Sequence, residues 1–163
     1  MIRRASLRCL FIAAALLITS PRRGESGQLA HATTAAALAR SADTIVLCAC
    51  DAGVSSWNDT PRIIVTRHQC RVEQAFKGQP ADMITVQVLG GRVGDVAMGS
   101  SATVSLAPGG DVVLMLRHSQ FGPYHVVAGG ADGVLPVSPA PQRTVRGMSL
   151  PDFARWVATE AAR

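Results

Sequence analysis

Short apolar runs separated by turn-forming residues make up most of the chain after residue 42. Within residues 63–76 the pattern alternates, which places Thr66, His68, Cys70 and Val72 on one face of a strand and longer polar side chains on the other. Runs that are rich in β-branched residues and bounded by glycine or proline predict strands. The predicted strands span residues 43–50, 63–76, 83–89, 111–117, 124–128 and 134–137.

The segments between these strands predict turns and irregular structure. The composition of residues 57–61, Trp-Asn-Asp-Thr-Pro, indicates a turn. Residues 92–110 are rich in glycine and carry only short apolar patches, so we expect irregular strands and a mobile loop there. Three prolines at positions 136, 139 and 141 mark a predicted linker.

Helices are predicted at the two ends of this β-rich region. Alanine-rich residues 33–42 indicate a short helix, and residues 149–162 indicate a second one. Ser149 is a suitable N-cap, and Pro151 fits the first turn of a helix. The second helix carries one apolar stripe at helical spacing, formed by Leu150, Phe153, Trp156 and Val157.

Together these elements predict a mainly β protein. Because no βαβ rhythm is present, we expect a small antiparallel barrel of five to seven strands rather than a parallel sheet. Closing the sheet into a barrel removes the exposed edges that so many short strands would otherwise present. The apolar stripe of the C-terminal helix is expected to seal one mouth of that barrel.

The first 32 residues predict an export signal and a polar linker that are removed from the mature chain. Three arginines precede the apolar run 9–18, as in the charged and apolar regions of a signal peptide. That run is too short for a membrane span, which needs about 20 apolar residues. A small-x-small cleavage site at residues 30–32 would leave residues 33–163 as one domain, exported to the periplasm or beyond the cell.

The net charge of +5 is misleading about binding partners. Residues 1–32 contain five arginines and one glutamate, so the remaining 131 residues carry 11 basic and 10 acidic groups. A protein that neutralises phosphates needs a basic patch. We therefore expect no nucleic-acid partner, and no transmembrane segment in the mature chain.

Several short motifs carry a family resemblance. They are Ala-Asp-Thr-Ile-Val at 42–46, Val-Glu-Gln-Ala-Phe-Lys-Gly at 72–78, the glycines at 90, 91 and 94, residues 108–116, and the glycines at 129, 130 and 133. With them, residues 38–137 resemble a group of uncharacterised bacterial exported proteins. Those proteins are in turn similar to the OB-type barrel of netrin-like and metalloproteinase-inhibitor (TIMP-like) domains. The resemblance implies the barrel fold more than a function.

The resemblance does not carry over the inhibitors' mechanism. Inhibitors of this type chelate the protease zinc with a cysteine at the mature N-terminus. Here the Cys-Ala-Cys segment, 48–50, lies 15 residues beyond the predicted mature start at Thr33 and within a predicted strand.

Cysteines are the most specific chemical feature of the predicted mature chain. Cys48, Cys50 and Cys70 allow a disulfide from Cys70 to either of the other two, which is the plain expectation in an oxidising compartment. A strand pairing centred on Asp59 would place Cys48 opposite Cys70, and one centred on Thr60 would place Cys50 there.

Two alternatives to a disulfide remain open at this stage. The cysteines can be buried free thiols that act as small hydrophobic side chains. They can also form a zinc or copper site whose four ligands are Cys48, Cys50, His68 and Cys70. We expect no metal, because neighbours on one face of a strand lie about 7 Å apart along it.

The sequence predicts no catalytic residue and no cofactor. Nucleophile-elbow, zinc-protease and phosphate-loop motifs are absent from it. His118 and His125 flank a predicted hairpin within reach of Asp111 or Asp132, but such histidines are usually half-exposed polar residues.

We therefore expect an exported, non-enzymatic binding module of unknown ligand, for which an extracytoplasmic protein is one candidate partner. Its expected contact surface is the open barrel face with the glycine-rich segment 90–110. The alternatives are an inhibitor of extracytoplasmic hydrolases that uses an exposed loop, and a small metal-binding or thiol-redox protein that uses the cysteine and histidine cluster.

Overall fold

The computed structural model describes residues 34–99 and 103–163. The predicted export signal at 1–32, its cleavage site and Thr33 lie outside the described residues. Within the described residues, no helix has both the length and the apolar character needed to cross a membrane.

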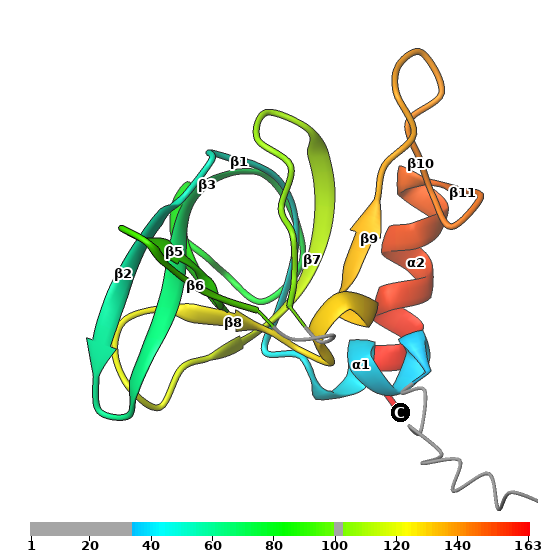
Figure 1. Cartoon of the computed structure of the whole chain (residues 1–163). Coiled ribbons are helices and arrows are strands. Elements are labelled where there is room, and N and C mark those ends of the chain that lie inside the picture. Colours follow the sequence, from blue (N-terminus) through cyan, green and yellow to red (C-terminus); the bar gives the residue numbers. More distant parts are fainter. Residues whose placement is uncertain (1–33, 100–102) are drawn as a thin grey trace, which may run out of the picture. The chain divides into compact units, whose positions relative to one another are not determined.

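Five strands close into a barrel, as predicted (Figure 1). In order around the barrel they are β1 (Thr44–Cys50), β3 (Arg62–Lys77), β4 (Met83–Leu89), β8 (His125–Val127) and β7 (Asp111–His118), and β7 pairs with β1 again. Four of these pairings are antiparallel, and β4 with β8 is parallel. The prediction of a small OB-type barrel is thus confirmed, with one parallel pairing that an entirely antiparallel barrel would not contain.

Strand β2 (Val54–Asp59) extends the barrel sheet beside β3 and is not among the strands predicted from the sequence. The pairing continues without interruption from Val54 opposite Arg67 to Asp59 opposite Arg62. The turn is therefore confined to Thr60 and Pro61, and the prediction of a turn over residues 57–61 began three residues too early. Asparagine and aspartate favour turns only as a tendency, and cross-strand pairing overrides it here.

The remaining strands are short. β9 (Val134–Pro136) pairs with β7, and β5 (Gly91–Val93) forms a hairpin with β6 (Val96–Met98) in the glycine-rich segment. A 3₁₀-helix, η1 (Gly130–Gly133), precedes β9. Residues 100–102, within the loop that we expected to be mobile, lie outside the described residues.

The proline-containing segment is a hairpin rather than a linker. Strands β10 (Thr144–Val145) and β11 (Met148–Ser149) pair with each other, and Val137 bridges to Val145. Val145 is fully buried, so this segment belongs to the domain core.

The two helices begin and end close to the predicted positions. Helix α1 covers Ala35–Ser41 and helix α2 covers Leu150–Ala161. The Ser149 hydroxyl accepts a hydrogen bond from the backbone N–H of Asp152, so this serine is the N-cap that the sequence predicted.

Both helices pack on the outside of the barrel, so the prediction that α2 seals a mouth is wrong (Figure 1). One apolar cluster joins Phe153 and Val157 of α2 to Leu38 of α1 and to alternate residues of β1 and β7, namely Ile45, Leu47, Val113 and Met115. A second cluster fills the barrel with the intervening residues of the same strands, Val46, Cys48, Leu114 and Leu116. The uninterrupted apolar runs of β1 and β7 are typical of strands that are buried on both faces.

Candidate functional site

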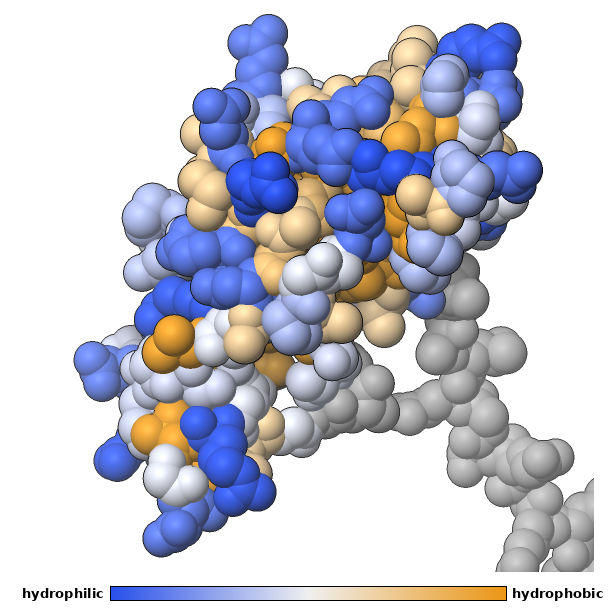
Figure 2. Space-filling view, turned by 90° about the horizontal axis from the view of Figure 1, so that it is seen from above, coloured by the Kyte–Doolittle hydropathy of each residue, from blue (hydrophilic) through white to orange (hydrophobic). Residues whose placement is uncertain are grey.

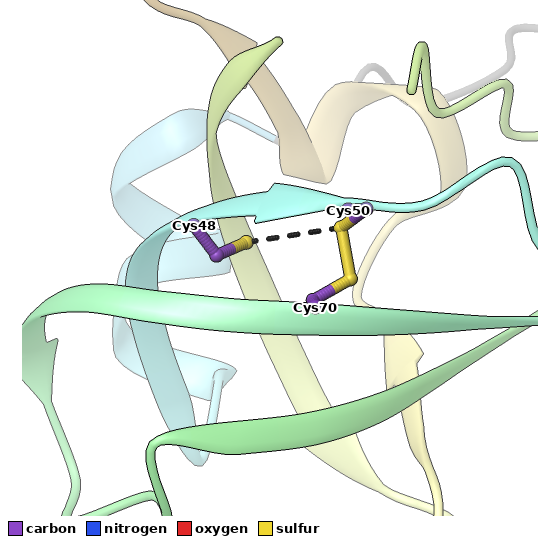
Figure 3. A group of neighbouring side chains, drawn as sticks. All are labelled: Cys48, Cys50 and Cys70. Carbon is purple, nitrogen blue, oxygen red and sulfur yellow. Dashed lines mark hydrogen bonds between the residues drawn. A yellow bond between two sulfur atoms is a disulfide. The ribbon is translucent and has the colours of Figure 1, made fainter. Parts of the chain in front are cut away.

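The three cysteines meet inside the barrel, where β1 lies beside β3 (Figure 3). Cys50 lies opposite Cys70 in the strand pairing, and the two form a disulfide. This is the pairing that the Thr60-centred arrangement predicted. The Asp59-centred arrangement, which would have joined Cys48 to Cys70, is not the one adopted.

A shift of one residue in the pairing brings Cys50 opposite Cys70. β2 places Val54 opposite Arg67, and the same register continued along the chain would place Cys50 opposite Arg71, on the outer face of β3. Residues 51–53, which connect β1 to β2, accommodate this one-residue change in register against β3. Gly53 has a φ of +71°, and a Cβ atom there would lie 2.7 Å from the His68 ring, so this crossing requires glycine.

Cys48 remains a free thiol and is fully buried. Burial, with a smaller contribution from Asp111, raises the pKa of this thiol to about 12. Its sulfur lies 4.0 Å from that of Cys50, and the ligand atoms of all three cysteines lie within 4.8 Å of one another.

The sulfur geometry does not favour thiol–disulfide exchange in the folded protein. The three sulfurs form a compact triangle, with 4.0 Å between those of Cys48 and Cys50 and all three within 4.8 Å of one another, whereas displacement at sulfur requires the attacking sulfur and the two disulfide sulfurs to lie nearly in a straight line. The attacking species would also have to be a thiolate, which the raised pKa of Cys48 suppresses. The arrangement is therefore typical of a structural disulfide with a buried neighbour.

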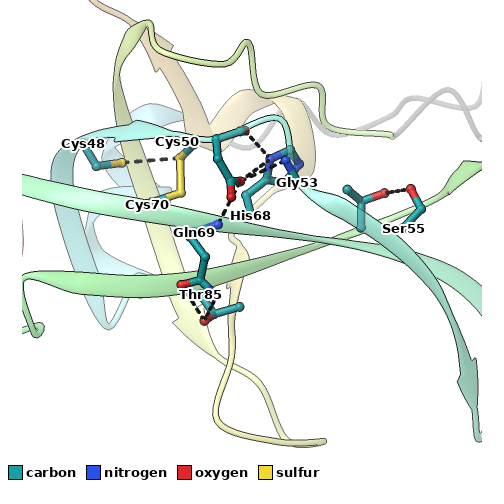
Figure 4. A network of polar contacts seen from close by, with 10 residues as sticks. Cys48, Cys50, Gly53, Ser55, His68, Gln69, Cys70 and Thr85 are labelled. Atoms are coloured by element: carbon teal, nitrogen blue, oxygen red, sulfur yellow. Dashed lines mark hydrogen bonds and ion pairs between the residues drawn. A yellow bond between two sulfur atoms is a disulfide. The ribbon is translucent and has the colours of Figure 1, made fainter.

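His68 takes a structural role instead of joining the cysteines (Figure 4). Its Nδ1 atom lies 2.9 Å from the backbone carbonyl oxygen of Asp51 and donates to it, because a carbonyl oxygen only accepts. The Asp51 carboxylate accepts from the backbone N–H groups of Gly53 and Gln69, at 2.9 and 3.0 Å. These bonds hold the chain where it passes from β1 to β2.

The hypothesis of a four-ligand zinc or copper site is weakened by this geometry. The cluster of close ligand atoms in the described residues contains Cys48, Cys50 and Cys70 but not His68. Two of those sulfurs are joined in the disulfide, and zinc and copper bind thiolates. In the oxidised protein, Cys48 alone could supply one.

A first prediction concerns the reactivity of Cys48. At pH 9 an ordinary thiol is mostly thiolate, whereas one with a pKa of about 12 is ionised to about one part in a thousand. We expect iodoacetamide to leave Cys48 unmodified in the native protein up to pH 9, and to label it fully after denaturation without reductant. Peptide mass spectrometry reads Cys48 separately from Cys9. Rapid labelling of native Cys48, or labelling of Cys50 or Cys70, would contradict the assignment.

His118 and His125 lie across from each other on β7 and β8, with ring centroids 4.8 Å apart. Burial, and then the charge of His118, lower the pKa of His125. The carboxylate beside this pair is that of Asp43, which accepts from the His118 backbone N–H at 2.9 Å, rather than that of Asp111 or Asp132.

The surface carries few exposed apolar side chains of large size. On the face seen in Figure 2, apolar side chains are interspersed with hydrophilic ones. Within the described residues, five large apolar side chains are exposed: Val54, Met83, Leu89, Val96 and Phe121. Two of these, Leu89 and Phe121, line one groove.

This groove has a volume of about 420 Å³, and its lining combines outward-facing residues of β3 and β4 with Val88 and Val104 of the cluster that fills the barrel. The tip of the β2–β3 hairpin borders it, and so does the loop that joins β7 to β8; the two lie close together at the lower left of Figure 1. None of its lining side chains is ionisable, and most are apolar: Asn58, Pro61, Ile63, Val65, Gln87, Val88, Leu89, Val104, Ser119, Phe121, Val126, Val127 and Gly130.

This groove was not predicted from the sequence. The expected contact surface was the open barrel face with the glycine-rich segment 90–110, and among the described residues of that segment only Val104 lines the groove. Two signals were present in the sequence: Leu89 ends a strand on its polar face, and Phe121 lies within a loop next to glycine. Neither signal shows that the two side chains meet, because they are far apart in the chain.

Comparisons of this chain with protein-family models, with curated proteins and with solved structures found no match.

Proposed function

We propose that this protein is an exported, non-enzymatic binding module, and that the groove between the β2–β3 hairpin and the β7–β8 loop receives an apolar group of its ligand. The observation that carries the proposal is the convergence of Leu89 and Phe121, 49% and 79% exposed, on a groove with uncharged walls. Large apolar side chains that stay exposed around a concave site are typical of binding surfaces.

The position of the groove within the barrel supports this proposal. Numbered along the chain, β3 and β4 are the second and third of the five barrel strands. The β2–β3 hairpin lies between the first and second of them, and the other bordering loop joins the fourth, β7, to the fifth, β8. In OB-type barrels the same face and the same loops bind ligands. This support is an analogy between folds, so the residues of the groove carry the argument.

The disulfide supports the exported part of the proposal. Disulfides form and persist mainly in oxidising compartments, and the Cys50–Cys70 bond is buried in the barrel. The apolar run at residues 9–18 is in agreement with export.

Titration with octan-1-ol, a neutral probe with an alkyl chain, tests the proposed site. We expect saturable binding to the wild-type protein, and binding about tenfold weaker in Leu89→Ser and in Phe121→Ser, because each change removes apolar surface from the groove. Isothermal titration calorimetry measures the affinities.

Met83→Ser is the matched control for these variants. Met83 lies on β4 like Leu89 and is similarly exposed, at 52%, but it does not line the groove. The affinity of the Met83→Ser protein for octan-1-ol should equal that of the wild type. Equal weakening in all three variants, or no binding to the wild type, would refute the proposed site.

A further inference from the structure

A row of four side chains crosses the barrel next to the groove. Arg67 of β3 lies opposite Gln87 of β4, Gln87 lies beside Val126 of β8, and Val126 lies opposite Arg117 of β7. Paired residues on neighbouring strands share a face of the sheet. Gln87 and Val126 line the groove, so an arginine lies at each end of this row.

The Arg67 guanidinium is oriented by neutral partners. Its Nε donates to the Gln87 side-chain oxygen at 3.2 Å, and its Nη1 donates to the Ser56 hydroxyl at 3.1 Å. The ring of Tyr124 lies against it, with 4.6 Å from the guanidinium carbon to the ring centroid. These contacts hold the group in place and leave its positive charge uncompensated.

Part of the Arg67 guanidinium is free to bind a ligand. Of its five N–H groups, the bonds to Gln87 and Ser56 use two. Within the described residues no hydrogen bond from the Nη2 atom is formed, and the Arg67 side chain as a whole is half-buried.

Charges elsewhere around the groove do not cancel this one. Among the described residues, no carboxylate lies within 4.0 Å of Arg67 or of Arg117. The Arg117 Nε donates to the backbone carbonyl oxygen of Ser41. At the hairpin tip, Asp59 lies directly opposite Arg62, so those two charges offset each other.

We infer that the ligand is a medium-chain carboxylate of the fatty-acid type, with its alkyl chain in the groove and its carboxylate on Arg67. This inference rests on the proposed function, because it assigns a ligand class to the same groove. An apolar groove with a cation at one end is complementary to an alkyl chain that carries an anionic group. A groove volume of about 420 Å³ is within the range of small-molecule sites. A protein partner would instead cover a surface of about 800 Å², much more than this one groove offers.

Three probes that share the same alkyl chain measure the contribution of the charged group separately from that of the alkyl chain. Octanoate, octan-1-ol and octylammonium are titrated into the wild-type protein, and calorimetry measures each affinity. Octanoate is expected to bind about tenfold more tightly than octan-1-ol, because a hydrogen bond to a charged group stabilises more than one between neutral groups. Octylammonium should bind more weakly than octan-1-ol.

Arg67→Gln tests which residue binds the carboxylate. In this variant the affinities for octanoate and octan-1-ol should become equal, while the octan-1-ol affinity stays at its wild-type value and shows that the groove is intact. Arg67→Lys should retain part of the preference for octanoate. The control is Arg71→Gln, which removes the same charge from the same face of β3 at an exposed position away from the groove, and should retain the full preference.

The outcomes distinguish this inference from the proposed function. Equal wild-type affinities for octanoate and octan-1-ol would overturn the carboxylate assignment and leave the apolar site in place. Binding of neither probe would overturn both. If Arg67→Gln does not fold, the salt dependence of binding to the wild-type protein tests the carboxylate assignment. Added salt should weaken the binding of octanoate, because it screens the charges, and should leave the binding of octan-1-ol unchanged.

Discussion

Reduction of the Cys50–Cys70 disulfide is expected to lower the free energy of unfolding by about 3 kcal/mol. The bond closes a loop across a sequence separation of 20 residues, and a cross-link of that span restricts the unfolded chain by about this amount. Since domains of this size are stable by only about 5–15 kcal/mol, the loss is a large share of the total. Reduction also leaves two thiols side by side in a fully packed barrel, which adds to the effect.

Urea denaturation of the Cys48→Ala protein, with and without reductant, isolates this contribution. With Cys9 also replaced by alanine, no other cysteine of the chain can pair with Cys50 or Cys70, and the two samples then differ only in the Cys50–Cys70 bond. The double variant Cys50→Ala/Cys70→Ala should fall near the reduced sample. A loss below about 1 kcal/mol would show that the disulfide contributes little to the folded state.

Phe153→Ala is expected to cost about 4 kcal/mol of stability. The Phe153 ring is fully buried between helix α2 and the outer face of the barrel. It meets Phe76 of β3 edge-on, with ring centroids 5.0 Å apart, and lies 5.4 Å from the ring of Trp156. Truncation removes both aromatic contacts and leaves a cavity that the rigid barrel wall cannot fill.

Two variants on the same helix calibrate this prediction. Phe153→Leu retains most of the volume and should cost less than half as much, and Thr159→Ala, at an exposed position, should change stability by less than about 0.5 kcal/mol. Equal losses for Phe153→Ala and Phe153→Leu would contradict the packing argument.

Phe153→Ala also tests whether the helix-side cluster and the barrel-interior cluster unfold together. β1 contributes Ile45 and Leu47 to the helix side and Val46 and Cys48 to the barrel interior, so loss of either cluster exposes a strand of the other. Unfolding followed by circular dichroism and by Trp156 fluorescence in a Trp57→Phe background should therefore coincide. Two separate transitions would show that the helices unfold independently of the barrel.

Local patterns predicted the elements whose stability depends on neighbouring residues. The alternation along residues 63–76 correctly separated the buried face of His68 and Cys70 from the outer face of Gln69 and Arg71. The Ser149 cap placed the beginning of α2 correctly. Both features depend on chemistry within a few residues of the chain, which the sequence displays directly.

Elements held by distant partners were predicted less well. β2 is a strand because it pairs with β3, although its Trp-Asn-Asp end has turn-like composition. Val145 is buried by contacts with the helix-side cluster, although the prolines before it indicate a linker. For α2, the apolar stripe predicted burial but not the surface that buries it.

Sequence patterns are sufficient to show that this protein is a β-rich domain with helices at both ends, and that Cys70 has two cysteines within reach. Tertiary structure alone decided that Cys50 is the partner, because a one-residue shift at Gly53 changes which side chains of β1 and β3 lie opposite each other. The tertiary structure also creates the groove, because Leu89 and Phe121 are separated by 32 positions in the chain and meet only when the barrel closes. Local periodicity shows which face a side chain takes, whereas strand register and barrel closure depend on the free energy of the whole chain.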